Sequence, residues 1–298
     1  MKRISAFVIA IGLVVTALVV RSNMDDTSSS TSGRKAAVVC VPELEAACRT
    51  LGNDVDLTIE VASATAKRII DGASGIDAWI TLDGWPELVD ARLGRTATKD
   101  VIPLAFTKLV IAGVKERTAR LATGCGDPGW SCWLNSHGKS WAQVGGDPAW
   151  GTVKVALPPS TSALGLLLEA NALSSLAGTV DLATNDDGYP GWLAAVRQTI
   201  DDADPLGAFL LAFPAQYSAV GTTEAQTLTR LGSRQGDVSV LTPAPTAYAV
   251  AVIASFPAGK DVDAGKLTAA LVSQRWATLP EPDPGLPAPG VLLALSGL

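Results

Sequence analysis

KVALPPSTSALGLLLEANALSSLA, residues 154–177, is the stretch that decides the fold class. Its first apolar residues predict a short strand and the Pro-Pro pair predicts a turn; a mostly apolar helix follows Ser160, Thr161 and Ser162. Serine and threonine are favoured at helix N-caps because their oxygens accept hydrogen bonds from the free N–H groups of the first turn. The same N–H groups, at the positive end of the helix dipole, can hold an anion. The stretch therefore predicts a strand, a turn and a helix N-terminus, and its hydroxyl groups fit either a ligand site or a plain cap.

The same order of strand, turn and helix occurs earlier in the chain. Residues 55–61 alternate apolar and polar side chains as a strand does, and they lead into a helix at residues 66–71. Residues 76–82 predict another strand, followed by a turn and a helix at residues 87–93. Strands that alternate with helices over short links favour an α/β fold, a parallel sheet with helices on both faces. Ligands of such sheets bind beyond the carboxyl ends of the strands, which gives these candidate residues: Ser63, Thr65, Asp83 and Trp85.

The N-terminus carries a membrane-targeting pattern. Lys2 and Arg3 precede an apolar run at residues 4–20, whose length fits either a signal peptide or a short transmembrane helix. No Ala-x-Ala-like site and no nearby cysteine follows this run, which favours an uncleaved anchor with a cytoplasmic N-terminus. We therefore predict a signal or transmembrane segment at residues 1–21 and a flexible Ser/Thr-rich linker at residues 22–35. The domain that follows is expected outside the cell, on a single-pass anchor in the cell membrane or secreted after cleavage.

The composition fits an exported globular domain of mild acidity. Hydrophobic residues make up 48% of the chain, and the formal net charge is −6. Residues 36–298 are long enough for one two-lobed unit or two small domains. Because the chain has no Lys/Arg cluster, nucleic acid and anionic membrane surfaces are disfavoured as main partners.

Four cysteines indicate an oxidising compartment. They form two close pairs in the sequence, Cys40 with Cys48 and Cys125 with Cys132. The sequence allows three pairings, of which local closure is the simplest. On the chain-entropy model each small loop would then add about 2–3 kcal/mol of stability. The spacing does not suit a zinc site, since neither pair has the gap of a zinc knuckle and no histidine lies near the first pair. We expect disulfides and no metal.

Tryptophans gather close to the second cysteine pair. Trp130, Trp133, Trp141 and Trp150 lie in a Gly- and Pro-rich stretch. Such rings could stack on sugars, but large aromatic side chains beside a disulfide more often pack over it. We therefore interpret them as core residues.

The sequence gives little support for an enzyme. It has no Gly-x-Ser-x-Gly elbow and no His-Glu-x-x-His motif. The single histidine, His137, lies among polar residues in what we interpret as a solvated turn. The acidic pairs at residues 186–187 and 201–202 lack calcium-loop spacing and are interpreted as solvated faces or N-caps. We expect no catalytic residues and no cofactor.

The ordered set of features resembles the type 2 periplasmic solute-binding proteins, in an actinobacterial, membrane-anchored extracellular form. Residues 101–114 form an apolar run that could carry the chain between lobes. After a closing helix at residues 262–276, the Pro-rich residues 280–289 are expected to be extended. The segments that carry the resemblance are residues 55–65, 76–88, 104–114, 125–132, 140–146, 154–167, 236–256 and the closing helix.

The resemblance implies two α/β lobes joined by a hinge, which close on a ligand. The first lobe would comprise residues 36–108 and 250–298, and the second lobe residues 109–249. A small-molecule ligand, with an anion or carboxylate favoured by the hydroxyl groups at helix N-termini, would be captured for ABC-type uptake or for sensing, beside a membrane transporter or envelope partner. The sequence places no arginine in this cleft. The expected ligand-binding residues are Ser63, Thr65, Asp83, Trp85, Ser160, Thr161 and Ser162.

Two other functions stay open at the level of the sequence. An envelope interaction module could keep the fold without binding a small molecule. In that case Ser160, Thr161 and Ser162 would bond only to their own backbone, and Trp85 would fill the cleft. An exported hydrolase is the less favoured alternative, because it would have to use His137.

Overall fold

The structure is a computed structural model that describes residues 34–72, 75–278 and 285–298. The predicted signal or transmembrane segment at residues 1–21 lies outside the described residues, as does nearly all of the predicted linker. Within the described ranges, no helix is long and apolar enough to cross a membrane. Residues 36–298 form one compact unit.

The described strands form one mixed sheet, in the order β2-β1-β3-β9-β4-β7-β5-β6, with β8 also paired to β4. The pairs among β1, β2 and β3, and those of β5 with β6 and β7, are parallel, as predicted. The strands are β1 (Ala36–Cys40), β2 (Val55–Ile59), β3 (Ala78–Leu82), β4 (Asp100–Val114), β5 (Val155–Leu157), β6 (Ile200–Asp201), β7 (Ala219–Thr223), β8 (Val238–Leu241) and β9 (Tyr248–Ser255).

The two long strands β4 and β9 join the halves of this sheet, and here the sheet departs from the parallel pairing that the sequence predicts. They pair antiparallel with each other, because β4 carries the chain out of the first half and β9 brings it back. β4 continues beyond β9 to pair with β7 and β8. Its Pro103 lies at a register shift, where the missing N–H of proline is tolerated. We call the half with β1, β2 and β3 the first lobe and the half with β5, β6, β7 and β8 the second lobe.

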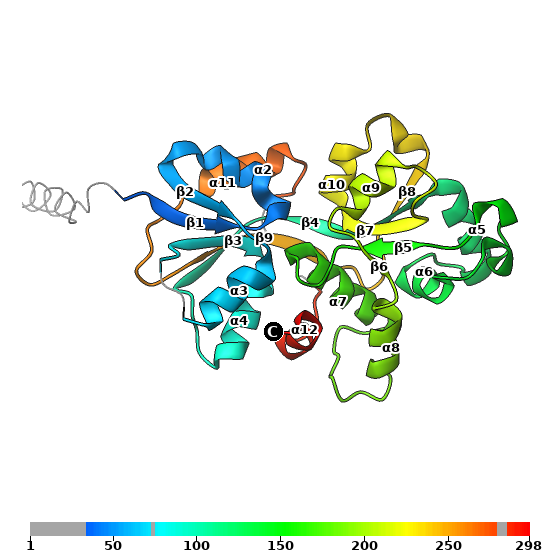
Figure 1. The fold of residues 1–298 in the computed structure, drawn as a ribbon, viewed down its shortest axis with the longest axis horizontal. Coiled ribbons are helices and arrows are strands. Elements are labelled where there is room, and N and C mark those ends of the chain that lie inside the picture. Colours follow the sequence, from blue (N-terminus) through cyan, green and yellow to red (C-terminus); the bar gives the residue numbers. More distant parts are fainter. Residues whose placement is uncertain (1–33, 73–74, 279–284) are drawn as a thin grey trace, which may run out of the picture. The chain divides into compact units, whose positions relative to one another are not determined.

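Helices cover both faces of each lobe (Figure 1). In the first lobe, α3 and α4 lie on one face and α2 and α11 on the other. The helices are α2 (Glu45–Cys48), α3 (Ala62–Ile70), α4 (Trp85–Leu93), α5 (Lys115–Cys125), α6 (Trp130–Ser136), α7 (Ala163–Ala177), α8 (Tyr189–Val196), α9 (Pro205–Leu211), α10 (Glu224–Arg230), α11 (Ala264–Ser273) and α12 (Pro289–Ser296), with 3-10 turns η1 (Pro42–Leu44), η2 (Arg49–Asp54), η3 (Trp141–Val144), η4 (Pro148–Trp150) and η5 (Gly232–Gly236).

Helix α7 is the buried centre of the second lobe. All its residues from Ala163 to Ser174 are buried, which explains a sequence that is apolar around the whole helix instead of along one stripe. The C-terminal helix α12 packs against both α7 and α4, so it contacts both lobes (Figure 1). Leu292 of α12 and Leu167 of α7 meet at Gly84, the residue before α4. No helix was predicted after residue 276, because the sequence pattern there is short and Pro-rich.

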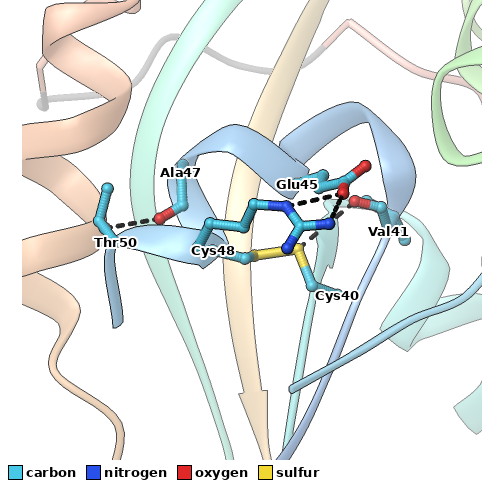
Figure 2. The surroundings of a disulfide bond; sticks show 7 residues. Cys40, Val41, Glu45, Ala47, Cys48 and Thr50 are labelled. Carbon is cyan, nitrogen blue, oxygen red and sulfur yellow. Dashed lines mark hydrogen bonds and ion pairs between the residues drawn. A yellow bond between two sulfur atoms is a disulfide. The ribbon is translucent and has the colours of Figure 1, made fainter. Parts of the chain in front are cut away.

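The disulfides follow the simplest predicted pairing. Cys40 bonds Cys48, at the carboxyl end of β1 (Figure 2), and Cys125 bonds Cys132. The interpretation of the tryptophans as core residues is confirmed for Trp130, Trp133 and Trp141, which are fully buried. The ring of Trp141 meets two other tryptophan rings edge to face, that of Trp133 at 6.4 Å and that of Trp150 at 5.2 Å between centroids.

Candidate binding cleft

The first turn of α7 caps itself. Ser162 is the N-cap, and its Oγ accepts a hydrogen bond from the N–H of Gly165 at 3.0 Å. The preceding Pro-Pro turn folds back onto the helix at the same place. A Cβ at Gly165 would lie 2.1 Å from the carbonyl oxygen of Pro159, so only glycine fits here. The plain-cap interpretation of Ser162 therefore accounts for its hydroxyl group.

The same turn is held by the first lobe. The N–H of Leu164 donates to Oε1 of Glu43 at 3.0 Å, from the 3-10 turn η1. The backbone N–H of Ser63 donates to the carbonyl oxygen of Thr161 at 3.1 Å. The indole Nε1 of Trp85 donates to the carbonyl oxygen of Ala163 at 3.3 Å. These hydrogen bonds join the two lobes directly.

A cavity of about 370 Å³ opens beside this junction. Its volume lies within the range of roughly 300–1,000 Å³ that is typical of small-molecule sites. Pro42, Glu43 and Val61 come from the first lobe, and the remaining lining comes from the second. The polar lining residues are Glu43, Thr161, Ser162, Asp204, Thr222, Gln226 and Arg230.

The charged groups of the cavity are largely paired with one another. Nη1 and Nη2 of Arg230 each donate to a carboxylate oxygen of Asp204 at 2.7 Å. The hydrogen bond from Arg230 holds the pKa of Asp204 below its usual value. Oε2 of Glu43 is buried and has no hydrogen-bond partner among the described residues. The cavity is therefore lined by an exposed ion pair, whereas Oε2 of Glu43 is buried away from solvent.

Comparison with solved structures identifies the fold. The iron-bound HitA of Pseudomonas aeruginosa matches with a TM-score of 0.56 and 12% identity, over 88% of this chain and 96% of that one. A periplasmic thiamin binding protein matches with a TM-score of 0.51 and 14% identity, over 88% and 92%. The sulfate-binding protein SubI of Mycobacterium tuberculosis matches with a TM-score of 0.51 and 13% identity, over 88% and 90%.

This chain has the periplasmic-binding-protein fold. The sequence itself matches no protein-family model and no curated protein. At 12–14% identity the likeness concerns the fold alone. The named ligands of these proteins include a metal, an organic cofactor and an oxyanion, so the fold does not select a ligand class.

Within this periplasmic-binding-protein fold, Thr161 and Ser162 are the predicted ligand residues that line the cavity. Thr65 is fully buried, and its Oγ1 donates to Oε2 of Glu60 at 2.7 Å, within the first lobe. The structure corrects the prediction of Thr65 as a cleft residue, because its position on α3 directs the side chain toward Glu60. Ser160 is half-buried and does not line the cavity.

The remaining predicted residues lie at the lobe junction but outside the cavity lining. Ser63 meets the second lobe through its backbone N–H. Trp85 is fully buried and packs edge to face on Trp79, with 6.4 Å between ring centroids. Asp83 follows β3, and its N–H donates to the carbonyl oxygen of Val250 at 2.8 Å. Burial of the indole removes the flat surface on which a sugar could have stacked.

Several cavity residues were missed from the sequence. Glu43 could have been found, since it follows β1 at the carboxyl edge where ligands of α/β sheets bind. Asp204 precedes Pro205 and caps α9, a recognisable helix start. Gln226 and Arg230 are four residues apart on α10 and share a face. Arg230 is the arginine that the sequence did not place, because nothing local connects α10 with the other cleft residues.

Glu169 lies buried in α7, with 7% of its surface exposed. The pKa of this carboxyl is raised to about 7, mainly by burial and in smaller part by the charge of Asp201. The charge of Arg197 and a hydrogen bond from the backbone of Ser160 lower the pKa of Glu169. The turn before α7 is therefore hydrogen-bonded, through the backbone of Ser160, to a carboxyl group whose pKa is about 7.

The interpretation of His137 as a solvated residue is wrong. Its ring is half-buried, and Nδ1 accepts a hydrogen bond from the N–H of Val155 at 3.0 Å. Burial lowers the pKa of this imidazole. Because Nδ1 is an acceptor here, it carries no proton for an orienting carboxylate of the Ser–His–Asp kind. His137 ties the end of α6 to β5 and acts as a structural residue.

Proposed function

We propose that this protein is an exported solute-binding protein that captures a small molecule in the cavity between its lobes. The observation that carries the proposal is the cavity of about 370 Å³, to which both lobes contribute polar groups. The fold supports it, since the solved periplasmic thiamin-binding and sulfate-binding proteins share it. The protein would act by binding and not as an enzyme.

The class of solute needs a separate argument. The sequence favoured an anion or carboxylate because hydroxyl groups stand at helix N-termini. In α7, however, the N–H groups of Leu164 and Gly165 are already bonded to Glu43 and Ser162. Two of the donors at the N-terminus of α7 on which the preference for an anion rested are therefore occupied.

The wider biological setting is part of the same proposal. Residues 1–21 would hold the protein at the outer side of the cell membrane, as an actinobacterial anchored form, and residues 22–35 would be the tether. The two lobes, at residues 36–108 with 250–298 and at residues 109–249, would move about the β4 and β9 strands as a hinge. Capture would serve an ABC-type transporter or a sensor, with closure favoured by contacts made only around the ligand.

A ligand screen with the full chain in mild detergent tests this proposal. Thermal unfolding would be followed by tryptophan fluorescence with sulfate, phosphate, amino acids, diamines, thiamin and sugars. A solute at about a hundred times its Kd adds roughly 2.7 kcal/mol, which raises Tm by a few degrees. Gln226→Ala, at the cavity, should remove this rise, and Gln235→Ala, at an exposed position outside it, should not.

An envelope interaction module is the second candidate, and specific observations favour it. Trp85 is fully buried against α7, and Ser162 bonds to its own helix. These are features expected of a cleft that no longer binds a solute. If no compound class raises Tm, this candidate replaces solute binding.

A further inference from the structure

The N-terminus of α7 is occupied by a carboxylate from the opposite lobe. The free N–H groups of a helix N-terminus carry partial positive charge and are a common binding site for anions. Here the N–H of Leu164 donates to Oε1 of Glu43, a residue 121 positions away in the sequence. An anion that approaches this helix end from the cavity meets a negative charge that is already bound there.

Glu43 is held firmly in this position. It lies in η1 between Cys40 and Cys48, whose disulfide closes the loop (Figure 2). Pro42 opens the turn, and the side chain of Leu44 is buried in the core. The segment therefore presents Glu43 to α7 from a covalently closed loop, with buried residues on its inner side.

The charges around the cavity also disfavour the binding of an anion. Glu43 and Asp204 are negative, and Arg230 is positive. Both Nη groups of Arg230 are bound to Asp204. Among the described lining residues there is consequently no cation without a partner, and the formal charges leave an excess of one negative group. The buried Oε2 of Glu43 adds an acceptor without a donor.

We propose that Glu43 is a specificity-determining residue that excludes anions from the cleft by occupying the α7 N-terminus itself. The solute would then meet this end of the cavity with a neutral or positively charged group, because the carboxylate of Glu43 takes the place of an anion there. This inference rests on the proposed solute-binding function and specifies its ligand class.

Substitution of Glu43 tests the inference with sulfate as the probe. Glu43→Ser removes the carboxylate and frees the N–H of Leu164, whereas Glu43→Gln keeps an acceptor oxygen and removes the charge. Glu45→Ser is the matched control, because Glu45 lies in the same disulfide-closed segment but pairs with Arg49 outside the cavity. Full-length variants would be titrated with sodium sulfate against sodium chloride of equal ionic strength, by thermal unfolding and calorimetry.

Glu43→Ser should gain saturable sulfate binding and a Tm rise of a few degrees. The wild type, Glu43→Gln and Glu45→Ser should show neither effect. Saturable sulfate or phosphate binding by the wild-type cleft would overturn the inference, as would a folded Glu43→Ser that binds no more sulfate than Glu45→Ser. If Glu43→Ser does not fold, Glu43→Asp withdraws the carboxylate by one methylene and should show the same gain more weakly.

The test of Glu43 gives a result that can be told apart from the test of the proposed solute-binding function. A gain of sulfate binding in Glu43→Ser needs no knowledge of the natural solute. If the wild type binds no solute at all but the variant gains sulfate, the function fails and the role of Glu43 stands. If the wild type binds an anion in the cleft, the function stands and the role of Glu43 fails.

Discussion

Replacement of Glu169 by glutamine should make the protein more stable at neutral and alkaline pH, but not at acid pH. The carboxyl is buried in α7, and its pKa rises from the ordinary 4.5 to about 7 because the charged form is desolvated. Glutamine keeps the shape and an acceptor oxygen for the backbone of Ser160, and it cannot ionise. The variant therefore isolates the free energy of ionising this one buried group.

The magnitude follows from proton linkage. The folded state holds the proton more tightly than the unfolded state, so the contribution of Glu169 to stability is fully present below pH 4.5. It is lost as the pH rises from 4.5 through about 7. Each pKa unit is worth about 1.4 kcal/mol, so the loss amounts to about 3 kcal/mol. The free energy of unfolding of Glu169→Gln relative to wild type should increase by this amount between pH 4.5 and pH 8.

Urea unfolding followed by tryptophan fluorescence at several pH values between these limits measures this difference. Glu116→Gln, an exposed glutamate in the first turn of α5, is the control and should give a difference that changes little with pH. A Glu169→Gln difference that stays constant within about 1 kcal/mol over the range would refute the reasoning. The carboxyl would then have the same affinity for its proton in the folded and unfolded states.

Two other perturbations test the local structure around the cleft. Burial lowers the pKa of His137 below 6.5, so its contribution to stability is present above pH 6.5 and is lost as the pH falls toward the folded pKa. In His137→Asn, the free energy of unfolding should therefore depend less on pH in this window than it does in the wild type. Gly165→Ala places a Cβ 2.1 Å from the carbonyl oxygen of Pro159 and should lower the free energy of unfolding in urea by about 1–3 kcal/mol. Its control, Gly290→Ala in α12, meets nothing within 4 Å and should be neutral or slightly stabilising; equal losses in both variants would contradict the close approach at Gly165.

Much of the fold was accessible from local patterns. Ser162 caps α7 as its residue type predicts, because a cap depends on atoms three residues away. The two disulfides close between cysteines eight and seven residues apart, where loop closure is simplest. The parallel pairing of β1 with β2 and β3 follows from strand–helix alternation. The antiparallel pairing of β4 with β9 could not be predicted in this way, because β9 follows β4 by about 140 residues in the chain.

The candidate site was less accessible. Thr161 and Ser162 line the cavity, and they could be singled out because a Ser/Thr-rich turn before a helix marks a strand end in an α/β sheet; their role in binding stays a prediction. The orientation of Thr65 toward Glu60 could not be predicted, because either side of a short helix can face a cleft. Arg230 and Asp204 appear as ordinary surface residues in the sequence, and their pairing requires α9 and α10 to be neighbours in space.

The sequence by itself determined which segments are strands and helices over most of the described chain, where α7 begins, and that α7 is mostly apolar. Those properties depend on hydrogen bonds and side-chain patterns within a few residues. Only the tertiary structure decided that Glu43 reaches Leu164, that Trp85 closes one end of the junction, and that α12 packs on both lobes. These contacts join residues that are far apart in the chain, and their geometry is set by the packing of whole lobes, which no local pattern encodes.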